Sequence, residues 1–512
     1  MRRGALAALR GWGLAALGAV LLMWVAVVDG RPAVFSDTAL YYDQAEYLFE
    51  ALHLVRPGQA IEPPGDPAAL PSRPGVPDTS AEIDGARSPI YGAPVYGLQR
   101  MGGLWLVAFA QAWAAAGVVY LLYRAAAPAA PRWGYLALMA GLAALTPLPF
   151  FASWIMPDLF AGVAGGGLLL LLVYPDRLGP SRLAGAALLT GFGLAVHRSN
   201  LLDAAAVILA AAVLLRLGGL PWRQVGRRVS LGGAIVLATL LAGALVYVPI
   251  RARAGVPIGT PPFMSARALA DGPGLAYLRR ACTGPGTPFA LCAFRDRPML
   301  TSDQILWSNR RRTAVFLAAD APTRMRMERE DAGFAVAETL ADPLAEARAS
   351  AWNAVQQFAM AYVDDPLKAQ GFYVSDSFWR TTVLPRILPG ADACPRTESC
   401  RPDVDKAVSW WLEGAGLLAS LLALGWRLSA GDVRPVLMRR TTASWEDDRV
   451  RLLTVLGLTL SLLVANAVVC GVLSGPFPRY QARLIWLVPL MAGLAISRLG
   501  WLRRATANTS GG

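Results

Sequence analysis

The sequence predicts an all-α polytopic membrane protein of about ten transmembrane helices, with both termini cytoplasmic and a mainly helical periplasmic domain. Three observations lead there. Apolar runs of about twenty residues recur along the chain, which is the length that a helix needs to cross a bilayer. Only 16% of the 512 residues are charged, whereas soluble domains carry about a quarter. Most arginines stand beside the apolar runs, as they do in membrane proteins.

The apolar runs give ten candidate spans. They lie near 11–29, 101–122, 134–151, 159–174, 183–197, 201–216, 230–250, 407–426, 452–473 and 484–500. The fifth and sixth spans are joined only by HRSN. The first run has a basic start but no clear A-x-A cleavage site, so we expect a retained anchor rather than a cleaved signal peptide.

The arginines orient the spans. Fifteen arginines fall before the first span, after the last, or in alternate short loops: Arg2, Arg3, Arg10, Arg124, Arg132, Arg177, Arg182, Arg223, Arg227, Arg228, Arg434, Arg439, Arg440, Arg503 and Arg504. The opposite short loops hold only Arg198, Arg479 and Arg483. The positive-inside rule then places both termini in the cytoplasm. The net charge of +13 reflects this topology and does not indicate a nucleic-acid partner.

The spans divide the chain into three parts. Residues 1–250 form an N-terminal transmembrane module of seven spans, with a periplasmic loop at 30–100. Residues 251–406 are long enough for a separate periplasmic domain. Residues 407–512 form a C-terminal transmembrane module with the last three spans.

The periplasmic domain is predicted to be mainly helical. Segments 302–318, 322–341 and 343–363 have helical spacing and are rich in Ala, Leu, Arg and Glu. In the preceding periplasmic loop, residues 56–89 are rich in Pro, Gly, Asp and Ser, which is typical of a long extended loop.

The cysteines agree with this topology. Cys282 and Cys292 form one close pair in the periplasmic domain, and Cys394 and Cys400 form another. An oxidising compartment lets each pair close a short loop as a disulfide. Zinc is the weaker alternative, because this domain has no histidine and neither pair has C-x-x-C spacing. Cys470, inside a predicted span, is expected to be a packed thiol.

The segment VFSDTALYYDQAEYLFEAL places several acids directly after the first span. Helical numbering from Asp37 puts Asp43, Glu46 and Glu50 on one side and apolar residues on another. This pattern predicts an interfacial helix with a solvated acidic face. Asp37, at the helix start, fits either an N-cap or a functional carboxylate at the membrane surface.

Further polar residues fall in short loops on the same side of the membrane. Asp158 lies in SWIMPDLFAG, where it is a capping candidate or a second functional acid. The turn HRSN holds His197, Arg198 and Asn200, and the turn GPFPRYQAR holds Arg479, Tyr480 and Arg483. Arginine suits a phosphate because its planar fork is always charged. Lipid-headgroup anchoring by the arginines and a structural hydrogen bond from His197 are the alternatives.

With these motifs the chain resembles the GT-C superfamily of integral-membrane glycosyltransferases, which use polyprenyl-phosphate-linked sugars. The resemblance rests on the acid in FSDTALYY, the helix after it, the join GLAVHRSNLLDAAAVILAA and the turn PRYQARLIWLVPL. It covers roughly 1–250 and 407–500. The adjacent acid pair of some members is absent, because Thr38 follows Asp37, and this leaves metal dependence open.

The resemblance implies an inverting sugar transfer at the periplasmic face of a bacterial inner membrane. The donor would be a polyprenyl-phosphate-linked sugar and the acceptor a glycan or lipid. Asp37 would be the general base, and Asp158 would orient the acceptor or bind a divalent cation, although no metal-ligand set or other cofactor is evident. The donor phosphate would be bound by Arg198, Arg479, Tyr480 and Arg483. The remaining candidates for substrate binding are His197, Asn200, Tyr41, Tyr42, Arg87 and Tyr91. The tyrosines would stack on sugar rings, and the alternative for them is a place in the aromatic belt at the membrane interface.

Other functions remain open on the sequence. An O-antigen polymerase or ligase also combines many spans with one large outer loop, and this loop contains Arg279, Arg280 and 310–312. A transporter is less expected, because no internal repeat is evident and few charges lie within the spans. A structural protein that binds partners through its outer domain is the third alternative.

Overall fold

The computed structural model describes residues 2–55, 83–254, 258–283, 288–308, 312–363, 406–438 and 444–497. Their regular secondary structure is helical apart from one pair of two-residue strands. The elements of the N-terminal part are α1 (Arg2–Leu22), α2 (Trp24–Val28), α3 (Ser36–Ala51), β1 (Ile83–Asp84), α4 (Pro89–Ala126), α5 (Arg132–Leu145), α6 (Leu148–Ser153), α7 (Leu159–Val173), η1 (Pro175–Arg177), α8 (Pro180–Ala195), α9 (Ser199–Leu217) and α10 (Trp222–Ala254). The remaining elements are β2 (Ile258–Gly259), α11 (Phe263–Asp271), α12 (Pro273–Ala281), η2 (Ala290–Phe294), α13 (Ser302–Trp307), α14 (Ala321–Ala341), α15 (Pro343–Ala359), α18 (Lys406–Ser429), α19 (Arg434–Leu437), α20 (Asp448–Leu473), α21 (Pro478–Ile485) and α22 (Leu487–Ser497).

Five helical segments are long and apolar enough to cross a membrane: Pro89–Ala126, Ser199–Leu217, Trp222–Arg253, Asp448–Leu473 and Pro478–Ser497. Shorter apolar helices cover three more of the predicted spans: Gly11–Leu22, Arg132–Leu145 and Leu159–Val173. By helix length and hydropathy the chain is therefore a candidate multi-pass membrane protein, and its helical class is confirmed.

Helix α7 lies at the centre of the largest hydrophobic core. Every residue of its sequence LFAGVAGGGLLLLLV is buried, which is why it shows no amphipathic pattern. It packs against α4, α8 and α20. Glycine permits the closest approach: a β-carbon at Gly162 would lie within 2.8 Å of the Trp486 indole, so the ring rests directly on the α7 backbone.

A second hydrophobic core is built by α11–α14, around residues such as Leu278 and Phe334. The disulfide between Cys282 and Cys292 closes a loop beside this core, which confirms that pair. Cys394 and Cys400 lie outside the described residues, as do 56–82 of the predicted extended loop.

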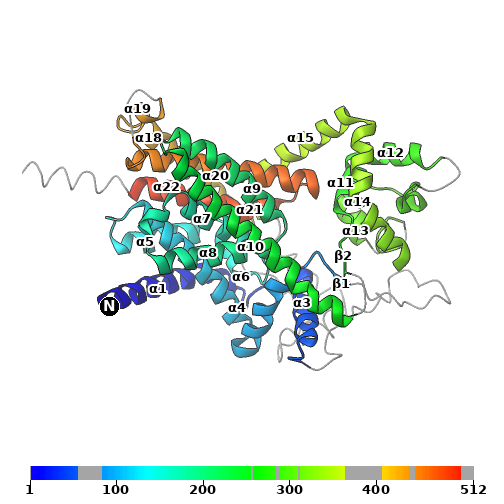
Figure 1. The fold of residues 1–512 in the computed structure, drawn as a ribbon, viewed down its shortest axis with the longest axis horizontal. Helices are drawn as coiled ribbons and strands as arrows, with labels where there is room; N and C mark the ends of the chain where they lie inside the picture. The colour runs from blue at the N-terminus through cyan, green and yellow to red at the C-terminus, as the bar shows by residue number, and fades with distance from the viewer. Residues whose placement is uncertain are drawn as a thin grey trace, which may run out of the picture.

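The helices of this part follow the predicted segments unequally. The predicted helix 302–318 is wrong over much of its length, because α13 ends at Trp307 and residues 312–318 are described as non-helical. Helices α14 and α15 meet at Asp342, as predicted, and the Asp342 carboxylate accepts a hydrogen bond from the Ala345 N–H. Figure 1 shows α11–α14 at one end of the molecule and the N-terminus at the other, with β1 and β2 on the side of α11–α14.

Helix α3 corrects two predictions. It begins at Ser36 with Phe35 at the N-cap position, so Asp37 lies within the first turn and is not the N-cap. Asp43 and Glu46 are buried, so the solvated acidic face is wrong for these two. The physical reason is that α4 and α10 both pack on α3. The helical spacing of α3 therefore distinguishes two packed faces rather than a solvent-exposed face and a buried one.

Candidate functional site

Five charged side chains that are distant in sequence meet in one place, here called the acid–arginine cluster: Asp37, Arg87, Asp158, Arg479 and Arg483. An Arg87 Nη2 lies 2.8 Å from an Asp37 carboxylate oxygen. The Arg479 guanidinium lies 4.0 Å from Asp37 and 3.9 Å from Asp158. The Arg483 guanidinium lies 3.5 Å from Asp158. The structure thus brings together both predicted acids and three of the predicted arginines.

Backbone contacts place Asp37 beside the Asp158 turn. Ala33 and Trp154 form an isolated parallel bridge, in which the Ile155 N–H donates to the Ala33 carbonyl at 2.9 Å. One residue after Asp37, the Thr38 hydroxyl donates to the Ile155 carbonyl at 2.8 Å. These bonds join the segment after the first apolar helix to the segment before α7, so the two acids arrive together.

Arg87 is held from two sides. It follows β1, which pairs in parallel with β2 at the start of the predicted periplasmic domain. The Tyr247 hydroxyl, from the end of α10, donates to the Arg87 carbonyl at 3.0 Å. The Arg87 side chain is only 13% exposed, so its charge acts on Asp37 with limited solvent screening.

Arg483 is the most deeply buried member of the cluster. Its Nη2 donates to the Ser199 hydroxyl and to the Asn466 side-chain oxygen, each at 3.1 Å. Its Nε has no hydrogen-bond partner in the described part of the chain, and its Nη1 meets one Asp158 carboxylate oxygen only as an ion pair at 3.5 Å, without a hydrogen bond. Buried polar atoms are nearly always paired, so this cluster has capacity to bind a further polar group.

Arg479 is held more loosely. Its side chain is 34% exposed, and its two carboxylate contacts are near the upper limit of an ion pair. The Tyr480 ring lies beside both guanidinium groups, with its centroid 5.5 Å from Arg479 Cζ and 5.3 Å from Arg483 Cζ. Of the three arginines, Arg479 is therefore the one best able to turn toward a ligand.

The surroundings fix the protonation state of Asp37. Burial by itself would raise the pKa of this carboxyl, but the charges of Arg87 and Arg479 outweigh it and hold the pKa below its ordinary value. At His197 burial lowers the pKa well below the ordinary value, and the nearby arginines act in the same direction. Near neutral pH the site thus combines an ionised aspartate with an uncharged histidine, whose Nδ1 lies 2.8 Å from the Ser199 hydroxyl.

The other predicted residues lie around this cluster in supporting or separate positions. The Arg198 guanidinium donates to the Thr260 hydroxyl at 3.2 Å, outside the cluster. The Asn200 amide donates to the Gly193 carbonyl at 2.8 Å and joins α9 to α8. Both are structural contacts, so neither residue is carried into the functional proposal.

The three tyrosines are interior residues. Tyr41, Tyr42 and Tyr91 are at most 3% exposed. Tyr41 and Tyr91 pack edge to face at 5.0 Å, and the Tyr91 hydroxyl donates to Gln111 at 2.6 Å. With their rings covered by protein, they have no open face for a sugar, and the stacking role receives no support.

Sequence reasoning missed the partners of Arg483. Asn466 is fully buried in the apolar helix α20, and its amide donates to the Gln481 side chain and to the Tyr480 carbonyl, each at 2.8 Å. An asparagine inside an otherwise apolar span is itself a signal, because such residues are costly in a membrane and have specific partners. Within the described ranges no group of three His, Cys, Asp or Glu residues could hold a metal ion.

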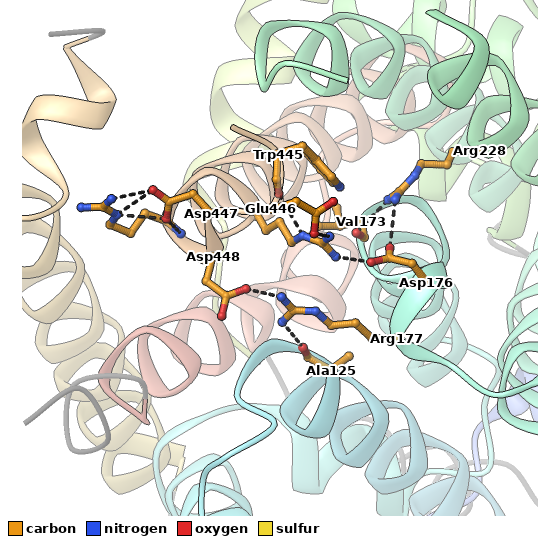
Figure 2. Close-up of polar contacts among 11 residues, drawn as sticks. Ala125, Val173, Asp176, Arg177, Arg228, Trp445, Glu446, Asp447 and Asp448 are labelled. Atoms are coloured by element: carbon orange, nitrogen blue, oxygen red, sulfur yellow. Dashed lines mark hydrogen bonds and ion pairs between the residues drawn. The ribbon is translucent and has the colours of Figure 1, made fainter. Parts of the chain in front are cut away.

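A second polar cluster lies where η1, α10, the start of α20 and the segment before it meet (Figure 2). We name it the Arg451 cluster, and its charged residues are Asp176, Arg228, Glu446 and Arg451. Asp176 accepts from Arg228 at 2.9 Å and from Arg451 at 2.6 Å. Arg451 also donates to Glu446 and to the Trp445 carbonyl. Its charged groups have short, complementary partners, which is typical of a structural clamp. The acid–arginine cluster has longer contacts and buried polar atoms without a hydrogen-bond partner among the described residues, so it is the better candidate for a binding site.

Comparisons with protein-family models, with curated proteins and with solved structures found no match to this chain.

Proposed function

We propose that the protein is a membrane glycosyltransferase that transfers a sugar from a polyprenyl-phosphate donor to a periplasmic or lipid-linked acceptor. In this proposal the chain crosses a bacterial inner membrane about ten times, with both termini cytoplasmic and the acid–arginine cluster facing the periplasm. The proposal unites the resemblance of the sequence to GT-C enzymes with the chemistry of this cluster.

The observation that carries the proposal is the pairing of Asp37 with Arg87 at 2.8 Å, with Arg479 at 4.0 Å on its other side. A general base must be ionised before it can accept a proton. The two guanidinium groups favour the ionised form of Asp37, and its side chain keeps 20% exposure. It is thus both charged and reachable.

The proposed reaction is a single displacement. The acceptor hydroxyl oxygen attacks the anomeric carbon of the donor sugar while the bond from that carbon to the phosphate oxygen breaks. The hydroxyl proton passes to Asp37, and the bonding electron pair leaves with the polyprenyl phosphate. Attack opposite to the leaving group inverts the anomeric centre.

The arginines would stabilise the leaving phosphate. Negative charge grows on the phosphate oxygen as its bond to the sugar breaks, and preorganised cations there lower the barrier. Arg479 is the mobile contact in this proposal, and Arg483 contributes its charge from a buried position, with an Nε that has no hydrogen-bond partner among the described residues. Asp158, only 3% exposed, holds these two arginines rather than the substrate.

The test uses Asp37→Asn, which keeps the shape of the side chain and removes its basicity. Membranes containing the full-length protein are incubated with radiolabelled polyprenyl-phosphate hexoses and pentoses, and transfer to endogenous acceptor is measured. We expect transfer to fall by about 100- to 10,000-fold, the range of a lost general base, at unchanged protein level in the membrane.

Glu50→Gln is the matched control, because Glu50 lies at the other end of α3 and has no part in the proposed reaction. It should keep the activity of the parent protein. Full transfer by Asp37→Asn would remove the proposed mechanism. Absence of transfer by the parent protein with every donor, together with no binding of farnesyl phosphate, would remove the proposed function.

A further inference from the structure

Helix α15 contacts the turn before the cluster arginines through one buried side chain, Gln357. Its Nε2 donates to the Phe477 carbonyl at 2.9 Å, and its Oε1 accepts from the Phe477 N–H at 2.8 Å. The side chain is fully buried. Phe477 stands two residues before Arg479, so a residue of the predicted periplasmic domain holds the turn that carries the cluster arginines.

This turn lacks a cap of its own. Phe477 occupies the N-cap position of α21 in an extended conformation, with no side-chain hydrogen bond to the helix. An N-cap is normally a Ser, Thr, Asp or Asn that satisfies free N–H groups. Here Gln357 supplies both an acceptor and a donor from another segment, while the Phe477 carbonyl also accepts from the Tyr480 N–H at 3.0 Å.

Helix α15 is itself fixed tightly enough to act as a support. At Gly471 of α20 a β-carbon would lie 2.9 Å from the Asn353 carbonyl group, so the two helix backbones are in direct contact. The Asn353 amide donates to Asp271 at 2.7 Å. Asp271 and Glu346 both pair with Arg267, at 3.2 and 2.6 Å, which joins α15 to α11.

The contacts therefore form a continuous path from α11 through α15 to the start of α21. At α20 the same path passes close to Arg483, because Cys470, the neighbour of Gly471, lies 3.5 Å from Arg483 Nη2. A small shift of α15 would move the turn at Phe477 and, with it, Arg479 and Arg483.

We propose that Gln357 is a positioning residue for Arg479 and Arg483, through which the periplasmic helical segment sets the geometry of the reaction site. The inference rests on the proposed glycosyltransferase function, in which the positions of the two arginines matter for sugar transfer. The positioning itself does not depend on the function, and the experiment measures the two separately.

The first variant is Gln357→Met, which keeps the length of the side chain and removes both hydrogen bonds. We expect faster amide hydrogen exchange at 479–485 in the full-length protein, because the start of α21 loses its anchor. We also expect kcat for sugar transfer to fall by up to about 100-fold, the cost of misplacing catalytic groups by about 1 Å, while KM for the acceptor stays unchanged. Gln356→Met, at the neighbouring and partly exposed glutamine, is the matched control and should change neither.

The second variant, Gln357→Glu, separates positioning from simple loss of stability. A protonated glutamate can replace the glutamine donor, whereas an ionised one repels the Phe477 carbonyl. Burial raises the pKa of a glutamate, so at acid pH we expect this variant to approach the parent protein in hydrogen exchange at 479–485 and in kcat. As the pH rises and the carboxylate ionises, both properties should shift to those of Gln357→Met or beyond. The ratio to the parent protein at each pH removes the effect of other titrating groups.

The outcomes are distinguishable. Unchanged exchange at 479–485 in Gln357→Met, or a pH-independent Gln357→Glu, would overturn the positioning role even if sugar transfer occurs. Altered amide exchange at 479–485 in a protein that neither transfers sugar nor binds farnesyl phosphate would support the anchoring role of Gln357 and overturn the proposed glycosyltransferase function. A lowered thermal midpoint with unchanged kcat would reduce Gln357 to a purely structural residue.

Discussion

Replacing Arg483 by methionine should destabilise the protein, and the buried ion pair with Asp158 should account for a measurable part of the loss. Arg483 is fully buried and Asp158 is 3% exposed, and their charged atoms lie 3.5 Å apart. At this distance the attraction is about 5 kcal/mol for an effective dielectric constant of about 20. Methionine leaves the Asp158 carboxylate buried with only the more distant Arg479 at 3.9 Å, so we expect a loss of about 3–5 kcal/mol.

A double-mutant cycle separates this pair from the other contacts of Arg483. Its bonds to Ser199 and Asn466 are lost in both variants that contain the methionine, so they cancel. Asp158→Asn alone removes the charge of the acid, and in that background Arg483→Met should cost less. We expect a coupling energy of about 2 kcal/mol, within the range for residues in contact.

The assay is denaturant unfolding of the parent protein and the three variants in detergent micelles, followed by tryptophan fluorescence. The four proteins are compared at one pH and in one buffer. A coupling energy below about 0.5 kcal/mol, the size expected for independent sites, would refute the argument, because the two residues would then not act as a pair.

Two further predictions concern the helices outside the acid–arginine cluster. The loop between Cys282 and Cys292 spans a sequence separation of 10, so the double variant Cys282→Ser, Cys292→Ser should lose about 3 kcal/mol of unfolding free energy. A reductant should lower the unfolding midpoint of the parent protein to that of the variant. A parent protein whose midpoint does not respond to reductant would contradict this prediction. Burial raises the pKa of Glu338 to about 7, and the nearby Glu346 acts in the same direction. Above the ordinary glutamate pKa of about 4.5, the unfolded state releases this proton while the folded state keeps it. The free energy of unfolding therefore falls as the pH rises from about 4.5 to 7. Glu338→Gln should accordingly gain stability relative to the parent protein at pH 8 but not at pH 4, and an equal effect at both would show that Glu338 is not buried as a neutral acid.

Part of the site was accessible from the sequence and part was not. Asp37, Asp158, Arg479 and Arg483 were predicted because few charged residues fall directly after the first span or in the short loops on the predicted periplasmic side. Their pairing was not predicted. Asp37 and Arg87 are separated by 50 residues, and nothing in either local pattern specifies the other as a partner.

The roles of Gln357 and Asn466 also depend on tertiary contacts that local sequence patterns do not specify. Each is a single amide in a helical segment, and only the packing of α15 and α20 against the α21 turn gives it a role. Asp43 and Glu46 were misplaced for a related reason. Helical periodicity identifies the faces of a helix, but it does not say how many of those faces other helices will cover.

The sequence by itself determined the helical class, the long apolar helices and the Cys282–Cys292 disulfide. These are decided by local composition and short spacing, which a linear pattern contains in full. Only the tertiary structure decided which charges meet, which acids are buried and which segment supports the arginine turn. Such contacts join elements up to several hundred residues apart, and their energies depend on distance and burial, which exist only once the helices have packed.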